Sequence, residues 1–283
     1  MDLAWVSWAA VLERAERELA DDLSNLDVVM ADLPLELFGE LLLAPPTRYS
    51  RLCGLLPRMP DEETQRAWTG DAGVSLVYKG TSFVRAALKY FSYRDVRVRG
   101  LTALDFGCGW GRLLRLFYKV FPVDQIEGVD PWDKSVAAFR ACGLPSHVGL
   151  SDYLPSILPT HRASFDIVYA YSVFTHLSPR AFATCLATLR RSIAADGTLL
   201  LTTRPAEYWL QTGKPEAYET HLRDGFCYVP HPFRVIDGDS VYGDISVGVD
   251  YLRQFDEWRV EDVEVSHTDP LQVLVALRPV TGR

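Results

Sequence analysis

Hydrophobic residues in the first part of the chain recur at spacings of three and four. Such a stripe, with charged residues opposite, predicts an amphipathic helix over residues 4–20. Its apolar members are Trp5, Trp8, Val11, Leu12, Ala15 and Leu19. The polar face is acidic, which favours packing against the protein's own domain over a membrane. Prolines between residues 45 and 60 then interrupt the chain, so residues 1–80 are predicted to form a helical N-terminal cap.

From residue 81 onward, helical and strand patterns alternate. The predicted helices cover residues 81–93, 110–119, 133–142 and 179–193. The predicted strands cover residues 101–106, 126–130, 147–150, 165–171 and 197–203. Strands separated by helices pair in parallel through right-handed crossovers. The order therefore predicts an α/β domain over residues 81–283 that is built on a doubly wound sheet.

The end of the chain follows a different pattern. Residues 259–266 alternate apolar and polar side chains, and residues 271–277 are almost all apolar. The four residues between them are too few for a parallel crossover, so the two segments predict an antiparallel hairpin. Residues 204–250 carry turn signals and form a large insertion before that hairpin. Insertions of this length in compact domains are usually lids or binding loops, which predicts substrate binding here.

Charge narrows the range of partners. The 283 residues carry a net charge of −8, which disfavours a nucleic-acid partner because phosphate backbones are repelled. One segment departs from this balance, since basic residues dominate between Arg85 and Lys119 and include Arg112 and Arg115. A solvated helix face is the favoured interpretation, and a patch for an anionic substrate group is the alternative.

The five cysteines are scattered and contain no CxxC pair. This spacing argues against a disulfide framework and against a structural zinc site, so no metal is expected and a reducing cytoplasmic location is favoured. The N-terminus lacks the positive region of a secretory signal. No apolar run is long enough to cross a membrane, so no membrane span is predicted.

The strongest chemical signal is the glycine-rich segment 105–111, which links a predicted strand to a predicted helix. Glycines there let a ligand approach the backbone at a helix N-terminus. The spacing is GxGxG, and Arg112 stands where a dinucleotide fingerprint has its last glycine. Asp105 would repel a pyrophosphate but favour a ligand that carries an ammonium and a sulfonium. Asp130 follows Gly107 by 23 residues, the distance of a ribose-binding carboxylate.

These motifs resemble those of class I, Rossmann-like S-adenosylmethionine-dependent methyltransferases. Residues 104–111 resemble their first motif, residues 127–130 their second, and residues 165–177 the segment around strand four. The resemblance implies a mostly parallel seven-stranded sheet with the C-terminal antiparallel hairpin, and S-adenosyl-L-methionine as cofactor. Asp105 and the glycines would hold the methionine moiety, Asp130 the ribose and Asp152 the adenine. The expected cofactor-binding residues are Asp105, Gly107, Cys108, Gly109, Gly111, Arg112, Asp130, Pro131, Trp132, Asp152, Tyr153 and Tyr171.

Residues 172–177 and 242–246 are further similar to bacterial O-methyltransferases that act on glycans or natural products. A saccharide or small-molecule hydroxyl is therefore the expected methyl acceptor. A hydroxyl must lose its proton as the new bond forms, and His176 is the first candidate base because it follows strand four at the sheet's ligand-binding edge. The alternative is that His176 only hydrogen-bonds the backbone. The insertion offers further candidates, most of which are expected to be ordinary loop residues: Arg204, Glu207, Tyr208, Trp209, His221, His231, Asp239 and Asp244. The expected acceptor-binding residues are Phe174, Arg204, Tyr208 and Trp209, the last two as exposed aromatic rings.

Several alternatives stay open at this point. Nothing in the sequence excludes methylation of nitrogen or carbon. A nucleotide-binding oxidoreductase is disfavoured by Asp105 and Arg112. A non-catalytic protein that binds the cofactor is a third alternative. The apolar face of residues 4–20 could be buried within one chain or between the two chains of a homodimer.

Overall fold

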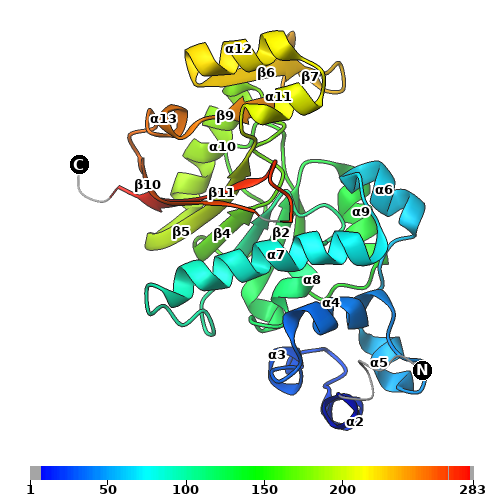
Figure 1. Ribbon diagram of the computed structural model, residues 1–283. Helices are drawn as coiled ribbons and strands as arrows, with labels where there is room; N and C mark the ends of the chain where they lie inside the picture. Colours follow the sequence, from blue (N-terminus) through cyan, green and yellow to red (C-terminus); the bar gives the residue numbers. More distant parts are fainter. Residues whose placement is uncertain (1–7, 267, 281–283) are drawn as a thin grey trace. The chain divides into compact units, whose positions relative to one another are not determined.

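The computed structural model describes residues 8–266 and 268–280 (Figure 1). The chain divides into two compact units, each made of two segments. The first comprises Met1–Thr102 and Cys108–Val148, and the second Ala103–Gly107 and Gly149–Arg283. The predicted boundary at residue 80 falls inside a helix. Among the described residues, no helix combines the length and the apolar character needed to cross a membrane.

The central sheet has seven strands in the order β10-β11-β5-β4-β1-β2-β3. Their bounds are β1 Ala103–Phe106, β2 Ile126–Asp130, β3 Val148–Leu150, β4 Phe165–Ala170, β5 Ile193–Thr203, β10 Trp258–Val265 and β11 Val273–Pro279. Strand β4 pairs in parallel with both β1 and β5, whereas β11 pairs antiparallel with β5 and β10. The predicted fold class and the C-terminal hairpin are confirmed. His267, in the predicted hairpin turn, lies outside the described residues.

Helices dominate the N-terminal part of the first unit (Figure 1, blue to cyan). They are α2 Ala9–Glu18, α3 Leu26–Val29, α4 Leu35–Leu43, α5 Ser50–Leu55, α6 Glu62–Thr69 and α7 Gly73–Ser92. The predicted apolar stripe is buried at Leu12, Ala15 and Leu19, and α2 contacts α3 and α5. A second chain is therefore not needed to cover these three side chains. Trp5 lies outside the described residues.

Two predicted helices of the first unit differ from the structure. Helix α7 begins at Gly73, eight residues before the predicted start at residue 81. The helix predicted over residues 110–119 is wrong in extent, since only α8 Leu114–Phe117 forms there. Gly111 has φ +80°, a left-handed conformation that an α-helix cannot contain, so the helix begins only after it. The unit also contains η1 Val123–Gln125 and α9 Asp133–Ala141.

The second unit contains α10 and the insertion (Figure 1, yellow to orange). Helix α10 spans Pro179–Ser192 and begins as its sequence dictates, since the Ser178 hydroxyl accepts a hydrogen bond from Ala181 N–H and proline occupies the first turn. The insertion, expected to be a lid or binding loop, is folded into short elements. These are α11 Glu207–Gln211, α12 Pro215–Asp224, β6 Phe226–Pro230, β7 Val235–Ile236, β8 Asp239–Ser240, β9 Gly243–Val247 and α13 Val249–Leu252.

Candidate active site

In the first unit, the glycine turn is joined to the end of β2 by Asp130. Its Oδ2 accepts a hydrogen bond of 2.9 Å from Gly109 N–H, and its Oδ1 accepts one of 2.9 Å from Trp132 N–H. Burial raises the pKa of Asp130, and hydrogen bonds from both backbone N–H groups and from the Ser135 side chain oppose that rise. A carboxylate has about four acceptor positions, so about one stays available after these three bonds. The Asp130 carboxylate can therefore still accept a hydrogen bond from a ribose hydroxyl.

Open space lies over the middle glycine of the turn. Gly109 has φ +56°, and a Cβ built there would meet nothing within 4 Å. At Gly111, by contrast, a Cβ would lie 2.5 Å from Leu144 Cδ2. Gly111 therefore permits close internal packing, whereas Gly109 leaves backbone uncovered for a ligand.

Two indole rings lie beside the end of β2. The rings of Trp68 and Trp132 are 4.7 Å apart between centroids, and the Lys134 ammonium lies 5.8 Å from the Trp132 centroid. Trp132 is half-buried, as is the neighbouring Pro131. The two indoles place flat apolar surface next to Asp130, which suits the nucleoside part of a cofactor.

Arg115 lies in α8, directly after the glycine turn, and its environment differs from the predicted one. It was expected on a solvated helix face, but its side chain is fully buried. The guanidinium donates to the carbonyl oxygens of Gly111 at 2.9 Å, Trp110 at 3.0 Å and Arg58 at 2.8 Å. Burial lowers the pKa of Arg115. The side chain therefore joins the glycine turn, through the carbonyls of Trp110 and Gly111, to the segment at Arg58.

In the second unit, the predicted cofactor residues occupy the ends of β1, β3 and β4. Asp105 is buried on β1 opposite Tyr169 of β4. Asp152 is exposed and Tyr153 is half-buried just after β3. Arg234 of the insertion donates to the Tyr153 hydroxyl at 3.1 Å and lies 4.5 Å above that ring. Sequence analysis missed Arg234, because nothing local to residue 234 indicates a contact with residue 153.

The remaining predicted residues of the first motif and of strand four are placed as follows. Gly107 lies against the Val173 side chain. Cys108 is buried, and Arg112 is half-buried. The Tyr171 hydroxyl donates to Asp269 Oδ2 at 3.4 Å, which links the end of β4 to the turn before β11.

Two of the predicted acceptor-binding aromatics are core residues. Phe174 has no exposed surface and packs between Phe106 and Phe182, at centroid distances of 6.3 and 4.8 Å. Trp209 is also fully buried, and its indole N–H donates to Ser246 Oγ at 2.6 Å. The expectation of an exposed ring at Trp209 is therefore wrong, because the buried indole finds its hydrogen-bond partner within the insertion. Tyr208 is half-buried, with the Arg204 guanidinium 4.0 Å from its ring centroid.

His176 lies in a network with Arg204 at the carboxyl ends of β4 and β5. Its Nδ1–H donates to the Gly243 carbonyl at 3.0 Å, and its Nε2 accepts from Arg204 Nη2 at 3.2 Å. Its ring also stacks on Tyr242, with centroids 5.1 Å apart. Burial lowers the pKa of His176 to about 4, and the Arg204 charge adds to this effect. The imidazole is therefore neutral at physiological pH, and both of its nitrogens are occupied.

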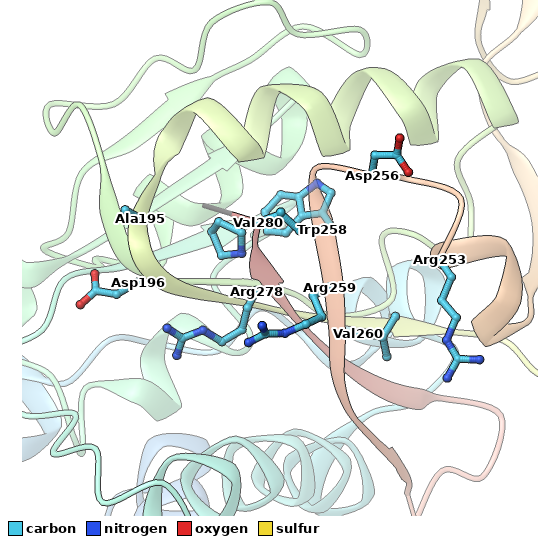
Figure 2. Close-up of a pocket in the computed structure, with 10 residues that line it drawn as sticks. Ala195, Asp196, Arg253, Asp256, Trp258, Arg259, Val260, Arg278 and Val280 are labelled. Carbon is cyan, nitrogen blue, oxygen red and sulfur yellow. The ribbon is translucent and has the colours of Figure 1, made fainter. Parts of the chain in front are cut away.

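A separate pocket of about 600 Å³ lies elsewhere in the second unit (Figure 2). Its lining comes from the amino end of β5 at Asp196, the start of β10 at Trp258 and the end of β11 at Pro279. Ligands of open α/β sheets bind beyond the carboxyl ends of parallel strands. This pocket is at the other end of β5, so it does not belong to the candidate active site.

Comparison with known proteins agrees with this geometry. Residues 103–197 match a family model described as a methyltransferase domain. A stretch of 105 residues is 28% identical to cyclopropane-fatty-acyl-phospholipid synthase of Escherichia coli (strain K12) and covers 37% of this chain. The match spans only 26% of that relative's length.

Solved structures that share the fold include two methyltransferases. One is an S-adenosylmethionine-dependent methyltransferase from Clostridium acetobutylicum ATCC 824, with 12% identity and a TM-score of 0.51 over 77% of this chain and 96% of that one. The other is the 1,6-didemethyltoxoflavin-N1-methyltransferase of Burkholderia thailandensis, with 13% identity and a TM-score of 0.51 over 77% and 83%. The family match identifies residues 103–197 as a methyltransferase domain, and the sheet order and the glycine turn agree with the class I, S-adenosylmethionine-dependent type.

Proposed function

We propose that this protein transfers a methyl group from S-adenosylmethionine to a hydroxyl oxygen of a small molecule or a saccharide. The observation that carries the cofactor side of this proposal is the Asp130 carboxylate, which accepts a hydrogen bond from Gly109 N–H and retains acceptor capacity for a hydroxyl group. The open backbone at Gly109 adds the room that a ligand needs.

The cofactor supplies a methyl carbon that is already activated by positive sulfur, so the protein has mainly to orient the acceptor and exclude water. Asp130 is proposed to accept hydrogen bonds from the ribose, beside the apolar surface of Trp132. Asp105, the glycines and Arg112 are proposed to hold the methionine moiety, and Asp152 with Tyr153 the adenine. A buried carboxylate at Asp105 favours a cationic ligand, as the sequence argument requires.

On the acceptor side, the proposal places the substrate at the carboxyl ends of β4 and β5. Arg204 and Tyr208 are the polar side chains proposed to bind the acceptor there, and Tyr171 follows the end of β4. Burial raises the pKa of Tyr208 to about 12, so its hydroxyl stays protonated and can donate a hydrogen bond. His176 as proton acceptor would require Arg204 to release Nε2 first.

Calorimetric titration tests the cofactor assignment. We expect S-adenosylhomocysteine to bind and NAD not to bind. Asp130→Asn should weaken S-adenosylhomocysteine binding by about tenfold or more, since a hydrogen bond to a charged group is worth about 1.5–3 kcal/mol. Asp133→Asn, an exposed acid three residues on, is the matched control and should bind like the wild type. Binding of NAD alone would refute the methyltransferase proposal.

A panel of acceptors tests the reaction. Sugars, phenols and aliphatic alcohols are incubated with the protein and S-adenosylmethionine, each beside its amine counterpart. Formation of S-adenosylhomocysteine and a methyl ether detected by mass spectrometry are the expected results. Turnover of the amines alone would replace the proposed oxygen acceptor with nitrogen.

A further inference from the structure

Strand β9 of the insertion lies at the carboxyl ends of the central strands, where ligands of open α/β sheets bind. Its backbone is hydrogen-bonded to the segments that follow β4 and β5. Gly243 N–H donates to the His176 carbonyl at 2.8 Å, and Ile245 N–H donates to the Thr175 carbonyl at 3.1 Å. Val247 N–H donates to the Arg204 carbonyl at 3.0 Å. These bonds place Asp244, between the first two donors, at the carboxyl ends of β4 and β5.

Asp244 is the hub of a charged cluster at this edge. Its side chain is only 12% exposed, and Arg204 donates to Oδ1 in a short, charge-assisted hydrogen bond. His231 Nε2 lies 3.0 Å from Oδ2, and Lys214 Nζ lies 3.9 Å from the same oxygen. Burial pushes the pKa of Asp244 upward, but the hydrogen bond and charge of Arg204, together with a hydrogen bond from Tyr208 and the effect of His176, outweigh it, so the pKa is lowered. Asp244 is therefore an anion that can orient and stabilise a protonated imidazole.

His231 differs from His176 in its ring nitrogens, because only Nε2 of His231 hydrogen-bonds to a side chain whereas both nitrogens of His176 are occupied. Its Nε2–H donates to Asp244, which fixes the neutral tautomer and puts the lone pair on Nδ1. Its side chain is 40% exposed, against 22% for His176. Backbone pairing holds the residue in place, since Pro230 opposes Gly243 in the β6–β9 ladder and His231 N–H donates to the Tyr242 carbonyl at 2.9 Å. An accessible imidazole oriented by a buried carboxylate is the arrangement of a general base.

We propose that His231, oriented by Asp244, accepts the proton of the acceptor hydroxyl during methyl transfer. This inference rests on the proposed function of the same site. As the acceptor oxygen forms a bond to the methyl carbon, the carbon–sulfur bond breaks and its electron pair stays on sulfur. The O–H electron pair stays on oxygen, and the proton moves to Nδ1 of His231. Asp244 then stabilises the imidazolium of His231. Because the His231 side chain is 40% exposed, it can release the proton to water.

His176 and Arg204 take a positioning role in this scheme. Arg204 bonds both Asp244 and the His176 Nε2, so it fixes the carboxylate that fixes His231. The charged and titratable groups that face the pair of His231 and Asp244 are Arg204, Lys214, His176 and Tyr208.

Nuclear magnetic resonance tests the dyad without any acceptor. Protein labelled with 15N-histidine and saturated with S-adenosylhomocysteine should show His231 in the Nε2–H tautomer. Asp244→Asn should let His231 adopt the Nδ1–H tautomer as well, because an amide can donate a hydrogen bond to Nε2 whereas a carboxylate can only accept one from it. His231→Gln identifies the resonance and serves as a second variant if Asp244→Asn does not fold. A Nδ1–H tautomer in the wild type, or a tautomer that Asp244→Asn leaves unchanged, overturns the proposal.

Turnover of the best hydroxyl acceptor from the panel gives the second test. His231→Gln should lower kcat by about 100-fold or more, the usual contribution of a general base, while binding of S-adenosylhomocysteine stays unchanged. The loss should shrink with an acidic phenol that is already ionised at the assay pH. His161→Gln, an exposed histidine outside the cluster, is the matched control. Equal losses with ionised and un-ionised acceptors contradict the proposal, whereas absent S-adenosylhomocysteine binding in the wild type contradicts the proposed function instead.

Discussion

At the scale of single residues, the role of a buried charged side chain depends on the groups to which it is hydrogen-bonded. Arg115 is fully buried and binds three backbone carbonyls, so its charge serves the glycine turn. Arg204 is 11% exposed and bonds an anion and a histidine. The two arginines have the same chemistry, and their neighbours give one a structural role and the other a place in the candidate active site.

Burial of His176 predicts a pH-dependent stability. Its pKa is lowered from 6.5 to about 4 in the folded protein, because burial and Arg204 disfavour the charged ring more than Asp244 favours it. Between these values the unfolded state binds the proton and the folded state does not. The free energy of unfolding should therefore fall by about 3 kcal/mol from this group as the pH drops from 6.5 to 4.

Urea unfolding of the wild type and His176→Gln at several pH values measures this contribution. His176→Gln should lose stability less steeply over that range, whatever its stability at pH 7. His161→Gln should keep the wild-type slope, since that residue is exposed. Parallel slopes for the wild type and His176→Gln would show that the ring of His176 is not held neutral by burial.

Sequence reasoning anticipated the residues whose role follows from local spacing. Asp130 was predicted from its spacing of 23 residues after Gly107, and in the structure it ends β2 and accepts a hydrogen bond from Gly109 N–H. His231 and Asp244 were named only among several candidates in the insertion, and Arg115 was expected in solvent, because the partners of a long or buried charged side chain depend on tertiary packing. Trp209 was expected to be exposed, since nothing near it in sequence reveals the Ser246 hydroxyl that satisfies its N–H.

At the scale of elements, the accuracy of the prediction varied among strands and helices alike, since α9 and α10 end within one residue of their predicted ends whereas β5 begins four residues before its predicted start. Strand β2 has the predicted bounds, since its apolar run leaves a single interpretation. The helix after the glycine turn was predicted too long, because its apolar pattern is helical but Gly111 is left-handed. The insertion was predicted only as a binding segment, and its short strands have too few residues to show a period.

The insertion depends on Ser246 for its internal order. The Ser246 hydroxyl is fully buried and binds the Trp209 indole N–H at 2.6 Å and His221 Nδ1 at 2.7 Å, which joins α11 and α12 to β9. Ser246→Ala should leave both groups unsatisfied, at a cost of about 1–3 kcal/mol for each buried group. Amide hydrogen exchange should become faster across α11 and α12.

Thr220→Ala is the matched control for this change, since its hydroxyl bonds only the Glu216 carbonyl one turn earlier on the exposed face of α12. Its exchange rates should match those of the wild type. Unchanged protection of α11 in Ser246→Ala would mean that packing of Trp209 holds the insertion without the hydroxyl.

At the scale of the whole molecule, stability does not depend on covalent cross-links. All five cysteines are free thiols, and four of them are buried. The temperature of unfolding should therefore be the same with and without a thiol reductant. Thiol titration in denaturant should find five reactive groups, and fewer groups, restored by reductant, would reveal a disulfide.

The β7–β8 hairpin has a consequence for the diversification of this enzyme. A hydrogen bond of 2.9 Å from His231 N–H to the Tyr242 carbonyl closes its base, and its tip at residues 237–238 is exposed. Chain can be lengthened or exchanged at such a tip without disturbing the residues below the closing bond. The β7–β8 hairpin is thus a natural location for sequence changes that alter the choice of methyl acceptor, and for a protein engineer to randomise codons while the residues below the closing bond are retained.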